Sequence, residues 1–201
     1  MERRVLVAST NAKKAAEMLA ILRSAPLGLE FVTLADYPDA PDVDECGETF
    51  VENARLKAMA GMALSGLPTI ADDGGLCIDA LDGRPGVKSH RFLGEHTSFP
   101  DKMSRILELM RSVPEGRRTC RFQCAVVAAF PSGRTFECMG SCEGAIGYTM
   151  TGSGGFGYDP IFYIPELRRY MAELTPGEKQ SISHRGKALA SVLDVLEHEY
   201  S

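Results

Sequence analysis

Two alternating segments joined by a very short turn constrain the fold of this chain more than any other feature. Residues 118–130 and 134–142 alternate between apolar and polar side chains, and Pro131-Ser132-Gly133 stands between them. Alternation with a period of two is typical of β-strands, and so short a connection makes the two strands antiparallel. The pattern therefore predicts a β-hairpin, and a sheet that contains it cannot be purely parallel.

Helix and strand patterns alternate along the rest of the chain. Short apolar runs predict strands at residues 5–8, 31–34 and 69–71, the last of them ending in an acidic turn at 72–75. Apolar side chains at helical spacing predict a helix that includes residues 15–22, and further helices at 50–64, 103–110 and from about 183 onward, with a mostly irregular stretch after residue 157. This alternation predicts an α/β fold with a mixed sheet.

Composition and charge exclude several classes of protein. The 201 residues fit a single domain over 1–201, and 44% hydrophobic with 24% charged residues is close to the average for soluble globular chains. The net charge of −5 argues against a nucleic-acid binder but not against a local basic pocket for phosphate. The apolar run Val5–Ala8 is too short for a signal segment or a membrane span, so we expect no membrane partner.

The six cysteines predict no metal site. They stand at positions 46, 77, 120, 124, 138 and 142, without a C-x-x-C pair. Cys120 and Cys124 would lie about 13 Å apart on one strand, too far for one zinc ion. We therefore expect reduced, mostly buried thiols in a cytoplasmic protein.

The first candidate for chemistry is the turn after the first predicted strand, Ser9-Thr10-Asn11-Ala12-Lys13-Lys14. A helix that begins there, with Thr10 or Asn11 as its N-cap, offers backbone N–H groups and lysines to a phosphate. The pattern of a P-loop is absent. Taken alone, this segment is better explained as an ordinary capped turn with solvated lysines.

Acidic residues form the second candidate. Asp72 and Asp73 follow a strand directly, where open α/β sheets place their ligands, and further acids crowd the loop before the second helix. Carboxylates suit Mg²⁺, which binds one or two of them together with water and substrate phosphate. Asp73 could also accept a proton from an attacking water. For Asp44 and Glu48, an acidic helix N-terminus is sufficient explanation.

Lysine and glycine patterns supply the remaining candidates. Asn53 and Lys57 share a helix face beside the apolar stripe of Val51, Ala54, Ala58 and Met62, and Lys57 is either solvated or a partner of phosphate or Asp73. Glycines at 152–157 permit close backbone approach, with Phe156 or Tyr158 as a stacking surface for a base, although a structural loop is the alternative. Lys179 and the basic start of the last helix, His184-Arg185, favour an anion.

Five ordered segments resemble the inosine triphosphate pyrophosphatase family, which hydrolyses XTP, ITP and dITP. They are ASTNAKKAAEM, ETFVENARLKA, IADDGGLCIDALDGRPGVKSHRF, GSGGFGYDPIFY and EKQSISHRGKAL, spread over residues 8–189. The resemblance implies an elongated three-layer α/β domain with a long mixed sheet flanked by helices. It also implies a cytoplasmic homodimer that uses Mg²⁺ to release pyrophosphate from a nucleoside triphosphate.

The resemblance also implies roles for individual residues. The Ser9–Lys14 turn and Lys57 would bind phosphates, Glu45 and Asp73 would bind the metal, and Asp73 would also accept the proton. The remaining residues would bind the base or support the phosphates: Phe156, Gly157, Tyr158, Asp159, Lys179, His184 and Arg185.

Two departures from the family pattern are visible. Gly74 stands where the family usually has a serine, which removes a hydroxyl from the substrate site, and His90 replaces a small residue. Gly74 keeps open a second hypothesis, a nucleotide-binding regulator with a weakened active site. A pyrophosphatase with a different base preference, for example for modified pyrimidines, is the third.

Overall fold

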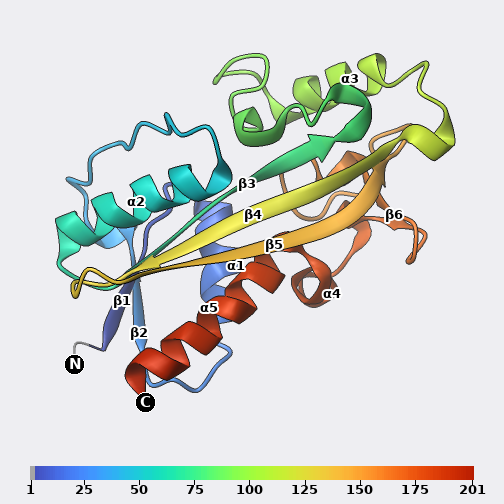
Figure 1. Cartoon of the computed structure of the whole chain (residues 1–201). Helices are drawn as coiled ribbons and strands as arrows, with labels where there is room; N and C mark the ends of the chain where they lie inside the picture. Colours follow the sequence, from blue (N-terminus) through green and yellow to red (C-terminus); the bar gives the residue numbers. More distant parts are fainter. Residues whose placement is uncertain (1–2) are drawn as a thin grey trace. The chain divides into compact units, whose positions relative to one another are not determined.

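The computed structural model describes residues 3–201, and it contains a seven-stranded mixed sheet (Figure 1). The strand order is β2-β1-β3-β4-β5-β6-β7. Strand β1 pairs in parallel with β2 and with β3, whereas the pairs β5–β6 and β6–β7 are antiparallel. The predicted α/β class with a mixed sheet flanked by helices is therefore confirmed.

The strands and helices follow one another largely as the sequence predicts. The strands are β1 (Arg4–Val7), β2 (Glu30–Thr33), β3 (Thr69–Ile78), β4 (Thr119–Ala129), β5 (Thr135–Ile146), β6 (Phe162–Ile164) and β7 (Arg169–Tyr170). The helices are α1 (Ala12–Leu22), α2 (Phe50–Ser65), α3 (Phe99–Leu109), α4 (Pro176–Ile182) and α5 (His184–Tyr200). No helix among the described residues is long and apolar enough to cross a membrane.

The chain divides into two compact units, and strands β3, β4 and β5 contribute residues to both. The first unit contains the chain up to Asp73, Cys124–Gly140 and His184–Ser201, and the second contains Gly74–Gln123 and Ser141–Ser183. The single domain expected over residues 1–201 stays a prediction.

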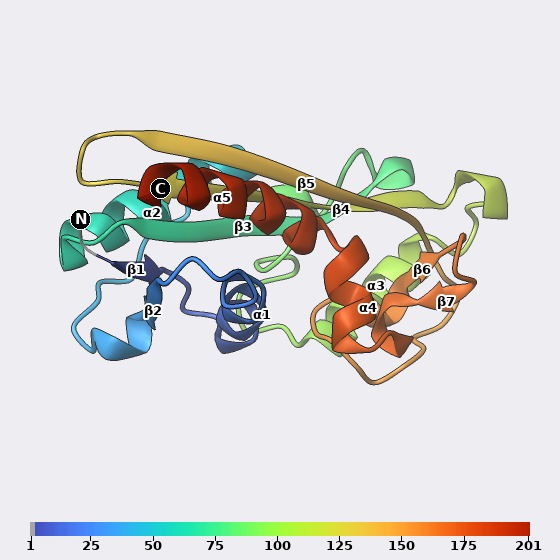
Figure 2. The ribbon, with the colours of Figure 1, turned by 90° about the horizontal axis from the view of Figure 1, so that it is seen from below.

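The core of the first unit lies between its strands and helices α1 and α5, which pack against each other. Val5 and Val7 of β1 belong to this core, together with Met18 of α1 and Leu189 of α5. Figure 2 shows α5 lying along the strands. Helix α2 packs on the opposite side of β1, where Gly61 leaves room for the side chain of Leu6. The alternation of β1 therefore gives the two faces of the sheet different helices.

The second unit has a separate core, built from α3, the ends of β3–β5 and the segment around β6. Arg118 is buried there, and its guanidinium donates to the carbonyls of Met110, Ile146 and Gly147 at 2.6–2.7 Å. These bonds satisfy a buried charge without a carboxylate, since backbone oxygens at the end of α3 and of β5 converge on it.

The hairpin prediction is confirmed, because β4 and β5 are neighbours in the sheet and Phe130 N–H donates to Arg134 O across the turn. The second strand extends to Ile146, four residues beyond the predicted end. Helix α3 begins earlier than predicted, because Ser98 caps it and Pro100 occupies its first turn. Helix α4 was not predicted and is capped by Thr175 and Glu178.

The predicted turn at residues 72–75 is wrong, since β3 continues through it to Ile78. Two glycines suggested a turn, but Gly75 serves close packing instead. A Cβ atom there would lie 2.3 Å from Ser89 Oγ and 2.4 Å from Gly86 O. Glycine inside a strand often marks such a close approach of another segment.

We predict that Gly140→Ala destabilises the protein whereas Gly177→Ala does not. A Cβ at Gly140 would lie 2.0 Å from the backbone oxygen of His184, so the start of α5 must shift. Overpacking of this kind costs about 1–3 kcal/mol of the free energy of unfolding. Gly177 in α4 has open space around it, and alanine there changes stability by less than about 1 kcal/mol. Thermal unfolding followed by circular dichroism compares the two, and equal melting temperatures would contradict the prediction.

Candidate active site

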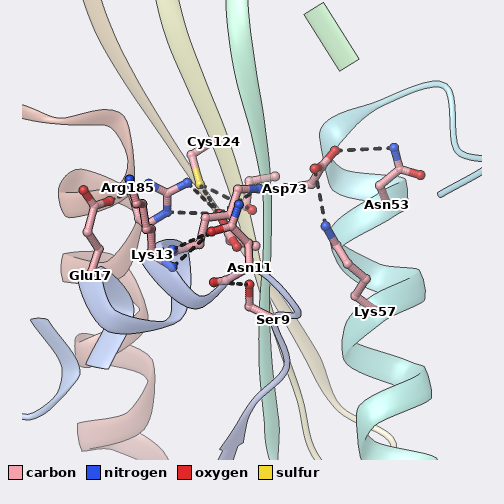
Figure 3. Close-up of polar contacts among 12 residues, drawn as sticks. Ser9, Asn11, Lys13, Glu17, Asn53, Lys57, Asp73, Cys124 and Arg185 are labelled. Carbon is pink, nitrogen blue, oxygen red and sulfur yellow. Dashed lines mark hydrogen bonds and ion pairs between the residues drawn. The ribbon is translucent and has the colours of Figure 1, made fainter. Parts of the chain in front are cut away.

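Strand β3 places two neighbouring carboxylates, Asp72 and Asp73, on opposite faces of the sheet. Successive side chains of a strand alternate, and Ile70 shares the face of Asp72 and belongs to the core under α1 and α5. Asp72 accordingly contacts residues of α1 and α5. Asp73 contacts Asn53 and Lys57 of α2 (Figure 3). Both carboxylates are buried, with 2% and 5% of their residue surface exposed.

On the α2 side, Lys57 joins the two acids that were predicted as metal ligands. Its Nζ lies 2.6 Å from Glu45 Oε1 and 3.4 Å from Asp73 Oδ1. Lys57 is one turn of α2 beyond Asn53, so the prediction that both residues share a face is confirmed by their contacts with Asp73. The sequence-predicted set of Glu45, Lys57 and Asp73 is therefore one cluster.

Burial and charge set the proton affinities in this cluster. Burial raises the pKa of Asp73 above its ordinary value, although Lys57 and Lys14 act in the opposite direction. Burial disfavours the charge of Lys57, but Asp73, Asp72 and Glu45 together raise its pKa. Asp73 is thus a more basic carboxylate than usual beside a firmly protonated amine, a combination that suits proton acceptance next to bound anions.

On the other face, Asp72 anchors Arg185 of α5. Its Oδ2 accepts from Arg185 Nε at 3.0 Å and from Nη2 at 2.9 Å, and Lys14 Nζ lies 3.7 Å away. Glu17 of α1 binds the remaining terminal nitrogen of Arg185 at 2.7 Å. Despite burial, Lys14 and Arg185 hold the pKa of Asp72 well below its usual range.

The carboxylates of Asp72 and Glu17 supply part of the negative charge that the basic start of α5 was expected to need. Basic residues at a helix N-terminus were expected to need an anion, and Arg185 receives two protein carboxylates. His184, the first residue of α5, is buried as well. The predicted contact of Arg185 and His184 with the base or phosphates stays a prediction, but Nε, Nη1 and Nη2 of Arg185 all bind Asp72 or Glu17.

The turn between β1 and α1 is a capped helix start, as one of the two predictions for it stated. Asn11 is the N-cap, and its Oδ1 accepts from the backbone N–H groups of Lys13 and Lys14 at 3.1 Å each. Ser9 Oγ donates to Asn11 O at 3.4 Å. Thr10, Ala12 and Lys13 are exposed, and Lys14 points its amine toward Asp72.

In the second unit, the predicted base-binding residues are held by Asp159. Its Oδ2 accepts from Phe156 N–H at 2.8 Å and from Lys179 Nζ at 2.7 Å, and this Nζ lies 4.5 Å from the centre of the Phe156 ring. Gly155 has a φ of +67°, and a Cβ there would lie 2.0 Å from Asp159 Oδ2. Glycine in this loop is therefore required by both conformation and space.

The expectation that Tyr158 could offer a stacking surface is wrong. Tyr158 is buried, its hydroxyl donates to Ser89 O at 2.8 Å, and its ring packs edge-on against Phe99. Its aromatic surface therefore belongs to the core of the second unit. Phe156 and Gly157 are only partly buried, so Phe156 is the aromatic residue of this loop with surface to offer.

Three residues of the first unit were not assigned a role from the sequence. Asp72 was named only as a member of the acidic set, Glu17 was not singled out, and Asn53 was placed beside the apolar stripe. In the structure the buried face of α2 contains Phe50, Asn53, Ala54, Ala58 and Gly61, so Asn53 belongs to the stripe itself. A polar residue at a position where the helical period expects an apolar one was the signal for its role.

Comparison with known proteins gives the family of this chain. Residues 5–195 match the Ham1 family. This chain belongs to the Ham1 family. A dITP/XTP pyrophosphatase of Geobacillus kaustophilus is 47% identical over 94% of this chain and 91% of its own. The solved HAM1 protein of Coxiella burnetii is 38% identical, with a TM-score of 0.87 over 97% of this chain and 98% of its own.

Two further relatives extend the likeness within the Ham1 family. A dITP/XTP pyrophosphatase of Desulforamulus reducens is 42% identical over 98% of this chain and 97% of its own. A solved nucleoside-triphosphatase, or dITP/XTP pyrophosphatase, of Mycobacterium abscessus is 42% identical, with a TM-score of 0.76 over 94% and 98% of the two chains.

The donor set of this Ham1-family chain fits Mg²⁺. Glu45 and Asp73 supply hard carboxylate oxygens, and one oxygen of each contacts the same atom, Lys57 Nζ. Two carboxylates with water and substrate phosphate are the usual Mg²⁺ environment in phosphate-transferring sites. Within residues 3–201, no group of three or more His, Cys, Asp or Glu side chains forms a metal site of protein ligands alone.

We predict that Asp72→Asn destabilises the protein far more than Asp79→Asn. Removing the charge of Asp72 leaves Arg185 buried with only part of its compensation, which costs about 3 kcal/mol of the free energy of unfolding. Asp79 pairs with Arg121 at the surface, where the loss is about 1 kcal/mol or less. Urea unfolding of both variants measures the difference. Equal losses would show that the Asp72–Arg185 pair is not a stabilising buried contact.

Proposed function

We propose that this chain is a nucleoside triphosphate pyrophosphatase that hydrolyses dITP, ITP and XTP to the monophosphate and pyrophosphate. The observation that carries the proposal is the cluster of Glu45, Lys57 and the buried Asp73, in a Ham1-family chain. The relatives named dITP/XTP pyrophosphatases, 42% and 47% identical over nearly the whole chain, support this substrate class.

The proposed reaction needs a proton acceptor and positive charge at the phosphates. A water oxygen forms a bond to the α-phosphorus, the bond from that phosphorus to the bridging oxygen breaks, and pyrophosphate leaves with the electron pair. Asp73, whose pKa burial raises, accepts the proton of the water. Lys57 and Lys14 stabilise the negative charge that moves onto the leaving group. Mg²⁺ bound to Glu45 and Asp73 would supply further charge neutralisation.

Selectivity for deaminated purines follows from hydrogen-bond complementarity. These purines carry a 6-keto acceptor where adenine has an amino donor, so a donor-rich site accepts the first and is left unsatisfied by the second. Such mismatches reach about 10⁴ in relative kcat/KM where the site is built for the bond. The base-binding roles proposed for Phe156, Gly157, Asp159, Lys179, His184 and Arg185 come from the family resemblance.

The finer assignments are part of the same proposal. We infer a homodimer in the cytoplasm, without nucleic acid as a partner. The six cysteines are thiols, five of them buried, which is consistent with a reducing compartment. The net charge of −5 disfavours binding to a polyanion such as DNA.

A nucleotide panel tests the substrate class. Pyrophosphate release from dITP, ITP and XTP should exceed release from ATP and dUTP by at least about 100-fold in kcat/KM, because only the keto purines satisfy a donor-rich site. Equal turnover of ATP would refute the keto-purine preference, and preferred dUTP would favour a pyrimidine enzyme. Binding of dITP with Mg²⁺ but without pyrophosphate release would favour the regulator that Gly74 suggests.

For Asp73→Asn we expect loss of turnover with the fold kept. The amide has the shape of the carboxylate but cannot accept the proton, so kcat should fall by about 10²–10⁴. Steady-state kinetics with dITP measure the loss, and circular dichroism checks the fold. Asp79→Asn removes a carboxylate just beyond the end of β3 and serves as the control with unchanged kcat. Full activity of Asp73→Asn would exclude Asp73 as the proton acceptor.

A further inference from the structure

Asn53 binds the backbone of Gly47 at two points. Its Oδ1 accepts from Gly47 N–H at 2.8 Å, and its Nδ2 donates to Gly47 O at 3.4 Å. The side-chain amide therefore accepts one hydrogen bond from Gly47 and donates one to it, as the backbone of a neighbouring β-strand would. Asn53 is completely buried, so these bonds also replace the water that its amide loses on folding.

The same amide reaches the candidate proton acceptor. Asn53 Nδ2 donates to Asp73 Oδ2 at 3.4 Å, while Lys57 contacts the other oxygen, Oδ1 (Figure 3). Asp73 is thus held at both oxygens by residues one turn apart on α2. With its orientation fixed from one helix, the carboxylate cannot rotate without losing one of the two contacts.

Gly47 has no room for a side chain on the Asn53 side. A Cβ there would lie 2.7 Å from Asn53 Oδ1 and 2.7 Å from Glu52 Cβ. Its φ is not in the left-handed region, so glycine is required here for contact and not for backbone conformation. The loop therefore lies against the first turn of α2, two residues after Glu45.

Capping of α2 does not account for these bonds. Thr49 Oγ1 already accepts from Glu52 N–H, and the Glu52 carboxylate accepts from the N–H groups of Thr49 and Glu48. The capping box is complete without Asn53. The side-chain bonds of Asn53 to Gly47 and Asp73 are additional to this cap.

We propose that Asn53 is a positioning residue that sets the separation of Glu45 and Asp73 by clamping Gly47 and Asp73 with one amide. The inference rests on the proposed function, since Glu45 and Asp73 are its metal-binding and proton-accepting groups. Asn53 itself touches no reacting atom. Residues that orient metal-binding and catalytic groups in this way typically contribute 10- to 100-fold to metal affinity or activity.

The kinetic test uses both sides of the clamp. Asn53→Ala removes the amide, and Gly47→Ala pushes the loop away from it, so each should lower kcat for dITP by about 10- to 100-fold. The double variant should lose no more than the larger single loss, because both changes break one contact. Glu199→Gln is the matched control: it weakens the ion pair between the buried Glu199, near the C-terminal end of α5, and the exposed Arg134, and it should leave kcat unchanged.

Two readouts separate positioning from a purely structural role. Hydrogen exchange of the Gly47 amide in the substrate-free protein should become faster in Asn53→Ala and stay slow in Glu199→Gln. Calorimetric titration of the same proteins with MgCl₂ alone should show affinity weakened about 10-fold or more in Asn53→Ala. A merely stabilising residue would lower the melting temperature and leave both measurements unchanged.

The outcomes distinguish this inference from the proposed function. If the wild type releases no pyrophosphate from any nucleotide, the proposed function fails, while the exchange and Mg²⁺ measurements still test the clamp. If the wild type is active and Asn53→Ala keeps its kcat, Mg²⁺ affinity and Gly47 protection, the positioning role of Asn53 is overturned. Multiplicative losses in the double variant would likewise contradict a shared contact.

Discussion

The interaction on which the site depends is the burial of two adjacent carboxylates within one strand. Asp72 and Asp73 lie inside β3, so their side chains leave the sheet on opposite faces. Two like charges at consecutive positions would be unfavourable if they shared a face and a single environment. The strand separates them, and each receives cations from different helices: Lys14 and Arg185 for Asp72, Lys57 for Asp73.

The two faces give the two carboxylates different properties. Asp72 is surrounded by Arg185 and Lys14, and its pKa lies well below the ordinary value, so it remains an anchor that does not take up a proton. Asp73 has one close lysine, Lys57, which does not offset the effect of burial, and its pKa is raised. One carboxylate therefore holds α5 and α1 through Arg185 and Glu17, while its neighbour is suited to chemistry.

The sequence was sufficient for the elements and the general location of the site, but not for the directions of the side chains. Apolar periodicity located the hairpin, α1, α2 and α5, because core packing imposes that periodicity directly. The strand through Asp72-Asp73-Gly74-Gly75 was missed, since local propensity favours a turn there and only contact with Ser89 and Gly86 explains Gly75. Tertiary contacts of this kind leave no periodic signal along the chain.

The same limit applies to the site residues. Glu45, Lys57 and Asp73 were found from charge and family resemblance, and the structure brings them together. Tyr158 was misjudged because an aromatic residue in a glycine-rich loop is expected to be exposed. In the structure its hydroxyl donates to Ser89 O, and its ring lies in the core. Asn53 and Glu17 were passed over because their partners, Gly47 and Arg185, lie in other segments.

Charge balance in the first unit explains why a triphosphate there would need an accompanying cation. The linked groups contain four acids, Glu17, Glu45, Asp72 and Asp73, and three bases, Lys14, Lys57 and Arg185. Their formal sum, three minus four, is −1, and every one of these bases already contacts a carboxylate. A polyanion that entered alone would compete with these carboxylates for the lysines, at a cost that grows as water is excluded. In the proposed reaction, a divalent cation held by Glu45 and Asp73 would neutralise part of the phosphate charge, and Lys57 would then be available to stabilise the charge on the leaving group.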